Sequence, residues 1–176
     1  MGMEVAAELR TPEGQRWIAE MAQVNVLLGA IVKVIHPTTF ATGAECVKAI
    51  GRSNKIEKAG NLKDLMKVWT SPFPAASVIN NRDTPLHRDN GATFESMDFL
   101  TSVGPFEYAK FMTPSLGCEF LFRSGTVIGL LGRIVPHAAE AVGERLCYAQ
   151  YLREIILAPL NVEGPKWVNI SDIIQS

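Results

Sequence analysis

Two histidines and one carboxylate in this sequence have the types and the spacing of a mononuclear iron site. His87 and Asp89 are separated by one residue, and His137 follows much later in the chain. Two histidines and a carboxylate can hold one face of a non-haem iron(II) ion and leave the other positions open for substrates. In an extended chain, His87 and Asp89 project from the same face, while Arg88 points away. We therefore expect His87, Asp89 and His137 to be the metal ligands and the catalytic centre.

Arg145 follows the distal histidine and is suited to binding a co-substrate. An arginine fork forms a bidentate pair with a carboxylate, such as the far carboxylate of a 2-oxoacid. Iron(II) with three protein ligands keeps three positions, of which the 2-oxoacid can chelate two while dioxygen takes the third. Oxidative decarboxylation would leave succinate and an oxidant for a C–H bond, which the protein positions and shields from water. Arg133 is the rival anchor.

Other readings of these residues remain open. A His-x-Asp or His-x-Glu pair alone is a weak signal, because the chain contains 18 carboxylates. In the alternative without a metal site, His87 and Asp89 form a surface hydrogen-bonded pair and His137 is a turn residue. Zinc is the competing metal, but structural zinc prefers four protein ligands with thiolates. The three cysteines (Cys46, Cys118 and Cys147) are not spaced for zinc, and their odd number favours a reduced intracellular compartment.

The first third of the chain is predicted to be helical. Thr11-Pro12 is a plausible helix start, and apolar residues recur at helical spacing until Pro37, which predicts one long amphipathic helix. A second helix is expected from about residue 38 or 39 to Gly51, and a short third one over 62–69. We expect these helices to form a scaffold packed on one sheet.

The sequence changes character from Pro74 onward. Short segments rich in β-branched or aromatic residues alternate with Gly, Pro, Asn or Ser over 76–80, 97–103, 109–112, 118–123, 126–131 and 146–152. Strands without intervening helices favour an antiparallel sandwich or jelly roll, in an α+β chain. A strand opened by Gly125-Thr126 is expected to end at His137, with a turn over 138–144 that returns Arg145 beside it. We expect one domain over 1–176, with a helical part about 11–70 and a jelly-roll core about 74–157.

Charge and hydropathy limit the possible partners. Lysine and arginine total 17 against 18 acidic residues, so no bulk positive field favours non-specific nucleic-acid binding and any DNA contact must be local. The longest apolar run, 24–35, is interrupted by polar residues and too short to span a bilayer, so a membrane protein is not expected. A basic region, predicted to be a solvated face rather than a phosphate track, contains Arg52, Lys55, Lys58, Lys63 and Lys67.

Several segments resemble the oxygenase domains of the TET and J-binding-protein family, in the compact form found in fungi. They cover residues 81–89, 102–104, 125–127, 132–137 and 143–149. The resemblance extends over about 15–157 and is most specific from Arg82 to Arg153. It implies a double-stranded β-helix, iron(II) at the two histidines and the aspartate named above, and 2-oxoglutarate anchored by Arg145. Arg82 stands where the family has a further arginine that can touch the co-substrate.

The resemblance also implies a substrate. The family oxidises, stepwise, a methyl group on a base flipped out of nucleic acid, such as 5-methylcytosine or thymine in DNA. Some relatives carry an acidic residue and a histidine where this chain has Ala92 and the neighbourhood of Leu157. Asn90 could contact the base instead, or it is a turn residue before Gly91.

Three functions therefore remain open at this point: a nucleobase methyl oxygenase, a 2-oxoglutarate oxygenase for another substrate such as a small molecule, and a module that binds metal or co-substrate without turnover. A nuclear location is expected if DNA is the substrate.

Overall fold

The structure is a computed structural model that describes residues 3–53, 56–57 and 62–174. Contacts divide the chain into two compact units. The first unit comprises residues 1–74, 156–163 and 167–176, and the second comprises 75–155 and 164–166. The first is largely helical and the second contains the two large sheets. The expectation of one domain over 1–176 stays a prediction.

The helical unit begins with two helices where one was predicted. Helix α1 (Pro12–Glu20) and helix α2 (Ala22–Ile35) are separated at Met21 and bent by 53°. The prediction of one unbroken helix was wrong, because the apolar spacing continues across the bend and periodicity alone does not reveal it. Among the described residues no single helix is long and apolar enough to cross a membrane, although this bent pair passes the same test of length and composition.

Side-chain caps fix two of the helix starts. The Thr11 side chain accepts a hydrogen bond from the Gly14 N–H at 3.1 Å, as expected for an N-cap that precedes a proline. Helix α3 (Pro37–Arg52) is capped by His36, whose Nδ1 accepts from the Thr39 N–H at 3.3 Å. The third predicted helix is α4 (Leu62–Val68).

The remaining short elements are β1 (Met3–Glu4) paired with β2 (Ile56–Glu57), and η1 (Glu8–Arg10), α5 (Glu154–Leu157), η3 (Ala158–Leu160) and α6 (Ile170–Ile174). The buried apolar cluster of the helical unit is Val5, Ile18, Leu62 and Leu65.

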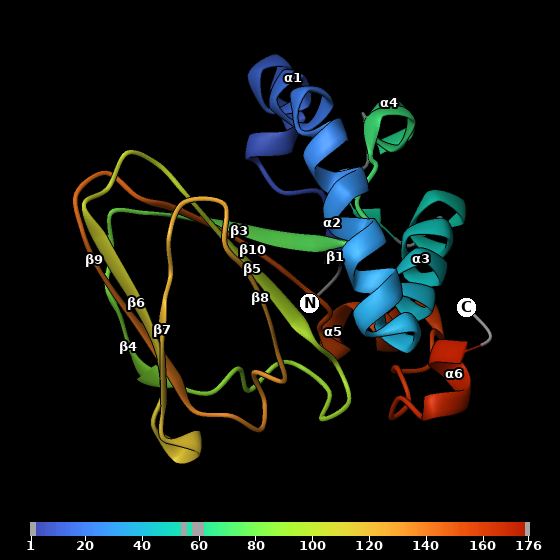
Figure 1. Cartoon of the computed structure of the whole chain (residues 1–176). Coiled ribbons are helices and arrows are strands. Elements are labelled where there is room, and N and C mark those ends of the chain that lie inside the picture. Colours follow the sequence, from blue (N-terminus) through green and yellow to red (C-terminus); the bar gives the residue numbers. More distant parts are fainter. Residues whose placement is uncertain (1–2, 54–55, 58–61, 175–176) are drawn as a thin grey trace. The chain divides into compact units, whose positions relative to one another are not determined.

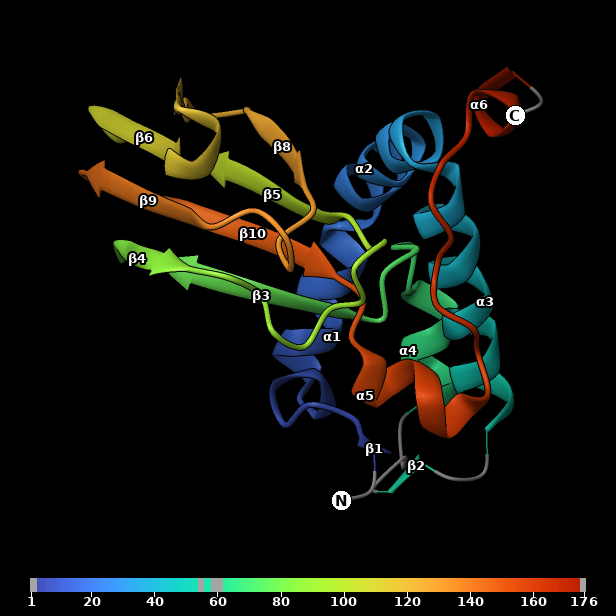
Figure 2. The ribbon, with the colours of Figure 1, turned by 90° about the horizontal axis from the view of Figure 1, so that it is seen from below.

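The second unit contains two four-stranded antiparallel sheets, as the jelly-roll prediction requires. One sheet has the order β3-β10-β5-β8 and the other β4-β9-β6-β7. Figures 1 and 2 show the two sheets facing each other, with strands that are far apart in the sequence lying side by side. The strands are β3 (Ala75–Asn80), β4 (Thr84–His87), β5 (Asp98–Val103), β6 (Tyr108–Thr113), β7 (Cys118–Leu121), β8 (Val127–Leu130), β9 (His137–Val142) and β10 (Leu146–Tyr151).

The apolar core of this unit lies between the sheets. Phe111 and Phe122 meet edge to face with their ring centroids 5.6 Å apart, an arrangement that aromatic pairs favour. They are joined in one buried cluster by Ala109, Leu130, Ala139 and Cys147. Alternate residues on β10 and just beyond it face a common cavity: Arg145, Cys147, Ala149, Tyr151 and Arg153.

One strand lies where a turn was predicted. His137 begins β9 rather than ending the preceding strand, and residues 138–142 pair with β6. The prediction failed because this strand is rich in alanine, which has low β-propensity, and pairing on both sides overrides that preference. The predicted turn over 138–144 was therefore wrong, and β9 and β10 belong to different sheets, although Arg145 and His137 line the same cavity.

Candidate active site

The three predicted metal ligands converge within the second unit. Their ligand atoms all lie within 4.8 Å of one another. His87 Nε2 is 3.8 Å from Asp89 Oδ1, and His137 Nε2 is 3.6 Å from Asp89 Oδ2. The two histidines are register partners on β4 and β9, which places their rings on the same face of the sheet. One cation can therefore contact all three side chains.

Backbone carbonyls orient both imidazole rings. His87 Nδ1 lies 2.9 Å from the Pro85 carbonyl oxygen, and His137 Nδ1 lies 3.0 Å from that of Val135. A proton on Nδ1 would be donated to each carbonyl, which leaves the Nε2 lone pair free for a metal. Burial lowers the pKa of His137, although the hydrogen bond to Val135 opposes the shift. The neutral, metal-binding form of this histidine is favoured.

Asp89 is positioned by a glycine that leaves room for its carboxylate. The Asp89 N–H donates to the Gly132 carbonyl at 3.0 Å. A Cβ on Gly132 would collide with Asp89 Oδ2 and would lie 3.1 Å from Asp98 Oδ2. Only glycine therefore allows this segment to approach the metal-binding carboxylate so closely.

A buried acid and an arginine adjoin Asp89, and the sequence reasoning did not single them out. Arg153 Nη1 donates to both oxygens of Asp98 at 3.2 Å, and its Nη2 lies 3.7 Å from Asp89 Oδ1. Burial raises the pKa of Asp98 to about 8, with Arg153 opposing the shift and Asp89 adding to it. The Arg153 guanidinium also stacks on Tyr151, 3.9 Å from the ring centroid. The position of Arg153 just past a predicted strand was the available signal.

Arg145 has the environment of an anion-binding residue. Its side chain is buried, its Nε donates to Ser102 Oγ at 2.9 Å, and its backbone N–H donates to Asn81 Oδ1 at 2.7 Å. The guanidinium lies 4.6 Å from the centroid of Phe122. Within the described residues, the buried Nη2 has no hydrogen-bond partner. An unsatisfied buried donor on a charged group is costly, so a carboxylate supplied by a ligand fits this site.

The metal ligands and Arg145 line the same pocket, whose volume is about 240 Å³. Arg82, the second expected co-substrate contact, lines it too. The remaining wall residues come from both sheets and their flanking loops: Ser77, Ile79, Thr84, Asp98, Leu100, Phe111, Phe122, Ala139, Cys147, Ala149, Tyr151 and Arg153.

Comparison with known families agrees with this geometry. A model of the Tet_JBP family, described as the oxygenase domain of the 2OGFeDO superfamily, matches residues 6–154. The chain belongs to this family. No curated protein matches the sequence significantly.

One of the similar solved structures supports the fold of this Tet_JBP domain. The structure of NgTET1 in complex with 5mC DNA superposes with a TM-score of 0.61 and 13% sequence identity, covering 98% of this chain and 62% of that one. The chain thus spans less than two thirds of that protein. Hydroxypropylphosphonic acid epoxidase from S. wedmorenis gives a TM-score of 0.33 at 20% identity, covering 44% of this chain and 42% of the other. At 13% identity, the likeness to NgTET1 concerns the fold alone.

Family membership assigns iron(II) and 2-oxoglutarate to this Tet_JBP domain as cofactors. The residues fit both groups. His87, Asp89 and His137 form the open-faced ligand set that iron(II) oxygenases use, and the unpaired Nη2 of Arg145 is available to the far carboxylate of 2-oxoglutarate.

Asn90 and Arg133, which the sequence suggested as a base contact and as a rival anchor, do not line the pocket. Asn90 has an exposed side chain and is absent from the described lining residues, so its role as a base contact stays a prediction. Arg133, the rival anchor, does not line the pocket either. Its Nη1 donates to the backbone carbonyls of Asn90 and of Ala92, the latter at 3.1 Å. Its guanidinium stacks on Phe94 with 4.8 Å to the ring centroid.

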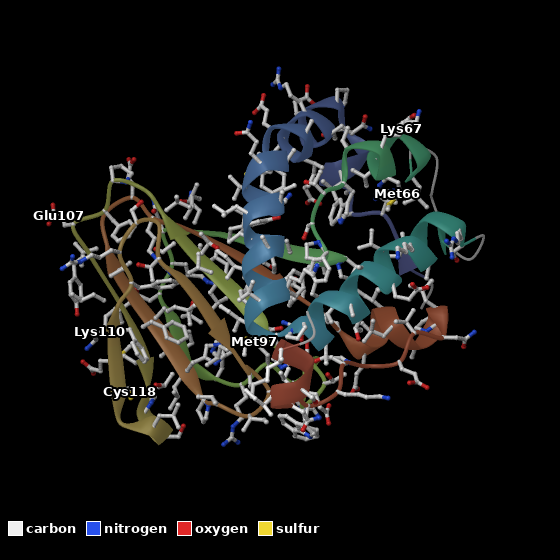
Figure 3. The ribbon with its side chains drawn as sticks, turned by 45° about the vertical axis from the view of Figure 1, so that its right-hand side comes forward. Met66, Lys67, Met97, Glu107, Lys110 and Cys118 are labelled. Carbon is white, nitrogen blue, oxygen red and sulfur yellow. The ribbon has the colours of Figure 1, made fainter. Side chains whose placement is uncertain are left out.

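The basic region is only partly described by the structure. Lys67 projects from α4 (Figure 3). Its Nζ lies 2.7 Å from Asp64 Oδ1, so a neighbouring carboxylate offsets its charge. Arg52 is exposed. Lys55, Lys58 and the side chain of Lys63 lie outside the described residues. All three cysteines are free.

Proposed function

We propose that this Tet_JBP domain is an iron(II)- and 2-oxoglutarate-dependent dioxygenase that oxidises the methyl group of a flipped nucleobase, with 5-methylcytosine in DNA as its substrate. The observation that carries the oxygenase activity is the convergence of His87, Asp89 and His137 in one pocket with the unpaired Nη2 of Arg145. The choice of substrate is supported by the family and by the DNA complex of NgTET1.

Each group of pocket residues has a distinct task in this reaction. Bound iron(II) and 2-oxoglutarate supply the oxidation of a C–H bond by dioxygen, with release of succinate and carbon dioxide. The two imidazole Nε2 atoms and the Asp89 carboxylate bind the metal. Arg145 orients 2-oxoglutarate through its fork, and Ser102 holds the guanidinium in place. The apolar walls that include Phe111 and Leu100 exclude water from the reacting groups.

The location of the pocket explains why the base must be flipped. The ligands lie within a cavity of about 240 Å³ lined by strands of both sheets, which has no room for a duplex. A methyl group within a stacked helix would stay out of reach, so an enzyme of this kind extrudes the target base into the pocket. Because the net charge is −1, we propose that DNA is held by a few local contacts rather than by a broad basic face. A nuclear location follows for such a substrate.

The test is mass spectrometry of nucleosides after incubation of the protein with iron(II), 2-oxoglutarate and DNA that contains 5-methylcytosine. Succinate should form together with oxidised 5-methylcytosine, and neither should form with His87→Ala. Unmethylated DNA of the same sequence is the matched control substrate. Succinate without any oxidised base would point to a different substrate, and no succinate under any condition would refute turnover.

A further inference from the structure

We propose that Arg88 and Arg133 form a clamp that positions Asp89 relative to His137, and that both arginines are positioning residues of the metal centre. We call this pair the arginine clamp. The inference rests on the proposed function, because it concerns the same metal site. It adds two residues that touch neither metal nor co-substrate.

The clamp is needed because the sheet does not hold Asp89. Strand β4 ends at His87, and the described ladder between β4 and β9 pairs His87 with His137 after an irregularity that follows Thr84. Asp89 lies past the end of this strand. Its distance from His137 therefore depends on contacts between two loops, 88–94 and 131–136, rather than on strand pairing.

Four hydrogen bonds, donated in both directions, join these two loops. Arg88 Nε donates to the carbonyl of Ile134 at 3.2 Å. Arg133 Nη1 donates in the opposite direction to the carbonyls of Asn90 and Ala92. Between them, the Asp89 N–H donates to the Gly132 carbonyl at 3.0 Å. Arg88 thus lies between the ligands His87 and Asp89 and reaches the loop that leads to His137. Arg133 lies in that second loop and reaches the residues that follow Asp89.

The loops that receive these bonds have local turns of their own. The N–H groups of Ile134 and Val135 both donate to the Leu131 carbonyl, at 2.9 and 3.0 Å, and the Ala92 N–H donates to the Asp89 carbonyl at 3.2 Å. Stacking on Phe94 fixes the direction of the Arg133 fork. Hydrogen bonds with a charged donor are stronger than neutral ones, so the clamp joins two preformed turns firmly.

Whether removal of an arginine strengthens or weakens metal binding distinguishes a positioning role from a purely electrostatic one. Neither Arg88 nor Arg133 is among the described residues that line the pocket, so each acts through the backbone. If their charges mattered most, replacing a cation near a divalent metal would strengthen metal binding. If the clamp positions Asp89, the same replacement weakens metal binding, because Asp89 would no longer be held in place and ordering it on binding would cost free energy.

The experiment measures cobalt(II) binding to the full chain under anaerobic conditions, with cobalt(II) as a spectroscopic substitute for iron(II). The variants are Arg88→Met and Arg133→Met, which keep an apolar stem and remove the fork. Arg123→Met is the matched control, because Arg123 is an exposed arginine that does not line the pocket. We expect each clamp variant to weaken cobalt(II) affinity roughly 10-fold, as partners of metal ligands do, and to change the visible absorption of the bound ion. Arg123→Met should keep both unchanged.

The clamp is overturned if the folded methionine variants bind cobalt(II) as tightly as the wild type, or more tightly, with an unchanged spectrum. A melting temperature that falls alone would show a merely structural role and would equally overturn the proposal. If Arg133→Met does not fold, Arg133→Lys replaces it: one amine cannot serve two carbonyls, and we expect weaker binding than in the wild type. Wild-type affinity in folded Arg133→Lys contradicts the clamp. Failure of the wild type itself to bind metal overturns the proposed function and the clamp together.

Discussion

His87 and His137 are direct partners across β4 and β9, and their ring centroids lie 4.3 Å apart. Antiparallel pairing thus brings two ligands from distant parts of the sequence to the same ion. The two rings differ in environment, however. His137 is 4% exposed and stacks on Phe111 with 5.6 Å between centroids, whereas His87 is only half-buried.

Removing any of the three ligands should abolish tight iron binding without unfolding the chain. The stability costs should nevertheless differ. His137→Ala leaves a cavity beside Phe111 and should cost about 1–3 kcal/mol, whereas His87→Ala and Asp89→Ala should cost less. Elemental analysis gives the iron content and urea unfolding gives the stability. Full iron retention in all three variants would refute the ligand assignment.

Arg145→Lys should weaken 2-oxoglutarate binding far more than iron binding. The lysine amine is a point charge and cannot reproduce the guanidinium fork, so we expect a loss of about 10-fold or more in co-substrate affinity. Calorimetric titration of the metal-loaded protein with 2-oxoglutarate measures the change, and iron affinity is the internal control. An unchanged affinity would transfer the anchor role to Arg82, the other expected arginine that lines the pocket.

Gly132→Ala should disrupt the metal centre although it adds a single methyl group. The new Cβ would collide with the Asp89 carboxylate, and we expect metal affinity to fall about 10-fold or more. Gly51→Ala is the matched control, because its Cβ would meet only Met66 at an ordinary 3.9 Å and alanine is favoured in a helix. Metal titration of both variants makes the comparison. Equal affinities would show that Asp89 is not confined by Gly132.

The stability of the helical unit should depend on pH through His36. Burial lowers the pKa of His36, and its Nδ1 must be unprotonated to accept the Thr39 N–H. A folded-state pKa below the unfolded value means that the unfolded chain binds more protons between the two values. Stability is therefore complete above about 6.5 and falls as the pH drops from there toward the folded-state pKa.

His36→Asn supplies the control for this pH dependence. Asparagine is a good N-cap that does not titrate. Between about pH 7.5 and 5, the range in which histidine titrates, the melting temperature of the variant should therefore lack the pH dependence that His36 causes. The wild type should lose stability over the same range relative to His36→Asn. A constant difference between the two proteins would exclude His36 as the titrating group.

Asn90→Ala should lower turnover of methylated DNA while iron and 2-oxoglutarate remain bound, if its exposed side chain reads the base. Succinate yield measures this effect, and wild-type turnover in Asn90→Ala would remove this residue from the substrate site.

The affinity of the wild type for methylated DNA should fall less steeply with salt than that of a strongly basic protein, because a chain of net charge −1 neutralises few phosphates. Filter binding at several salt concentrations measures this dependence.

The sequence predicted the ligand types well because His87 and Asp89 are local neighbours and strand geometry is simple. It could not predict their alignment with His137, which depends on pairing between β4 and β9. Alanine-rich β9 looked like a turn, since its strand conformation comes from its neighbours rather than from its own residues. Asp98 and Arg153 were missed for a similar reason: their contact joins positions far apart in the chain and depends on burial. The Thr11 cap was predictable because all its atoms lie within one turn.

The row formed by Arg145, Cys147, Ala149, Tyr151 and Arg153 makes the cavity unusually sensitive to insertions. Side chains along a strand alternate between faces, so one added residue near the start of β10 would turn the later members of this row outward together. A two-residue insertion would turn these side chains back toward the cavity, but it would shift the register of β10 against β3 and β5 by two residues. We therefore expect related sequences to vary in length at connections such as 123–126, and to differ in β10 by substitution only.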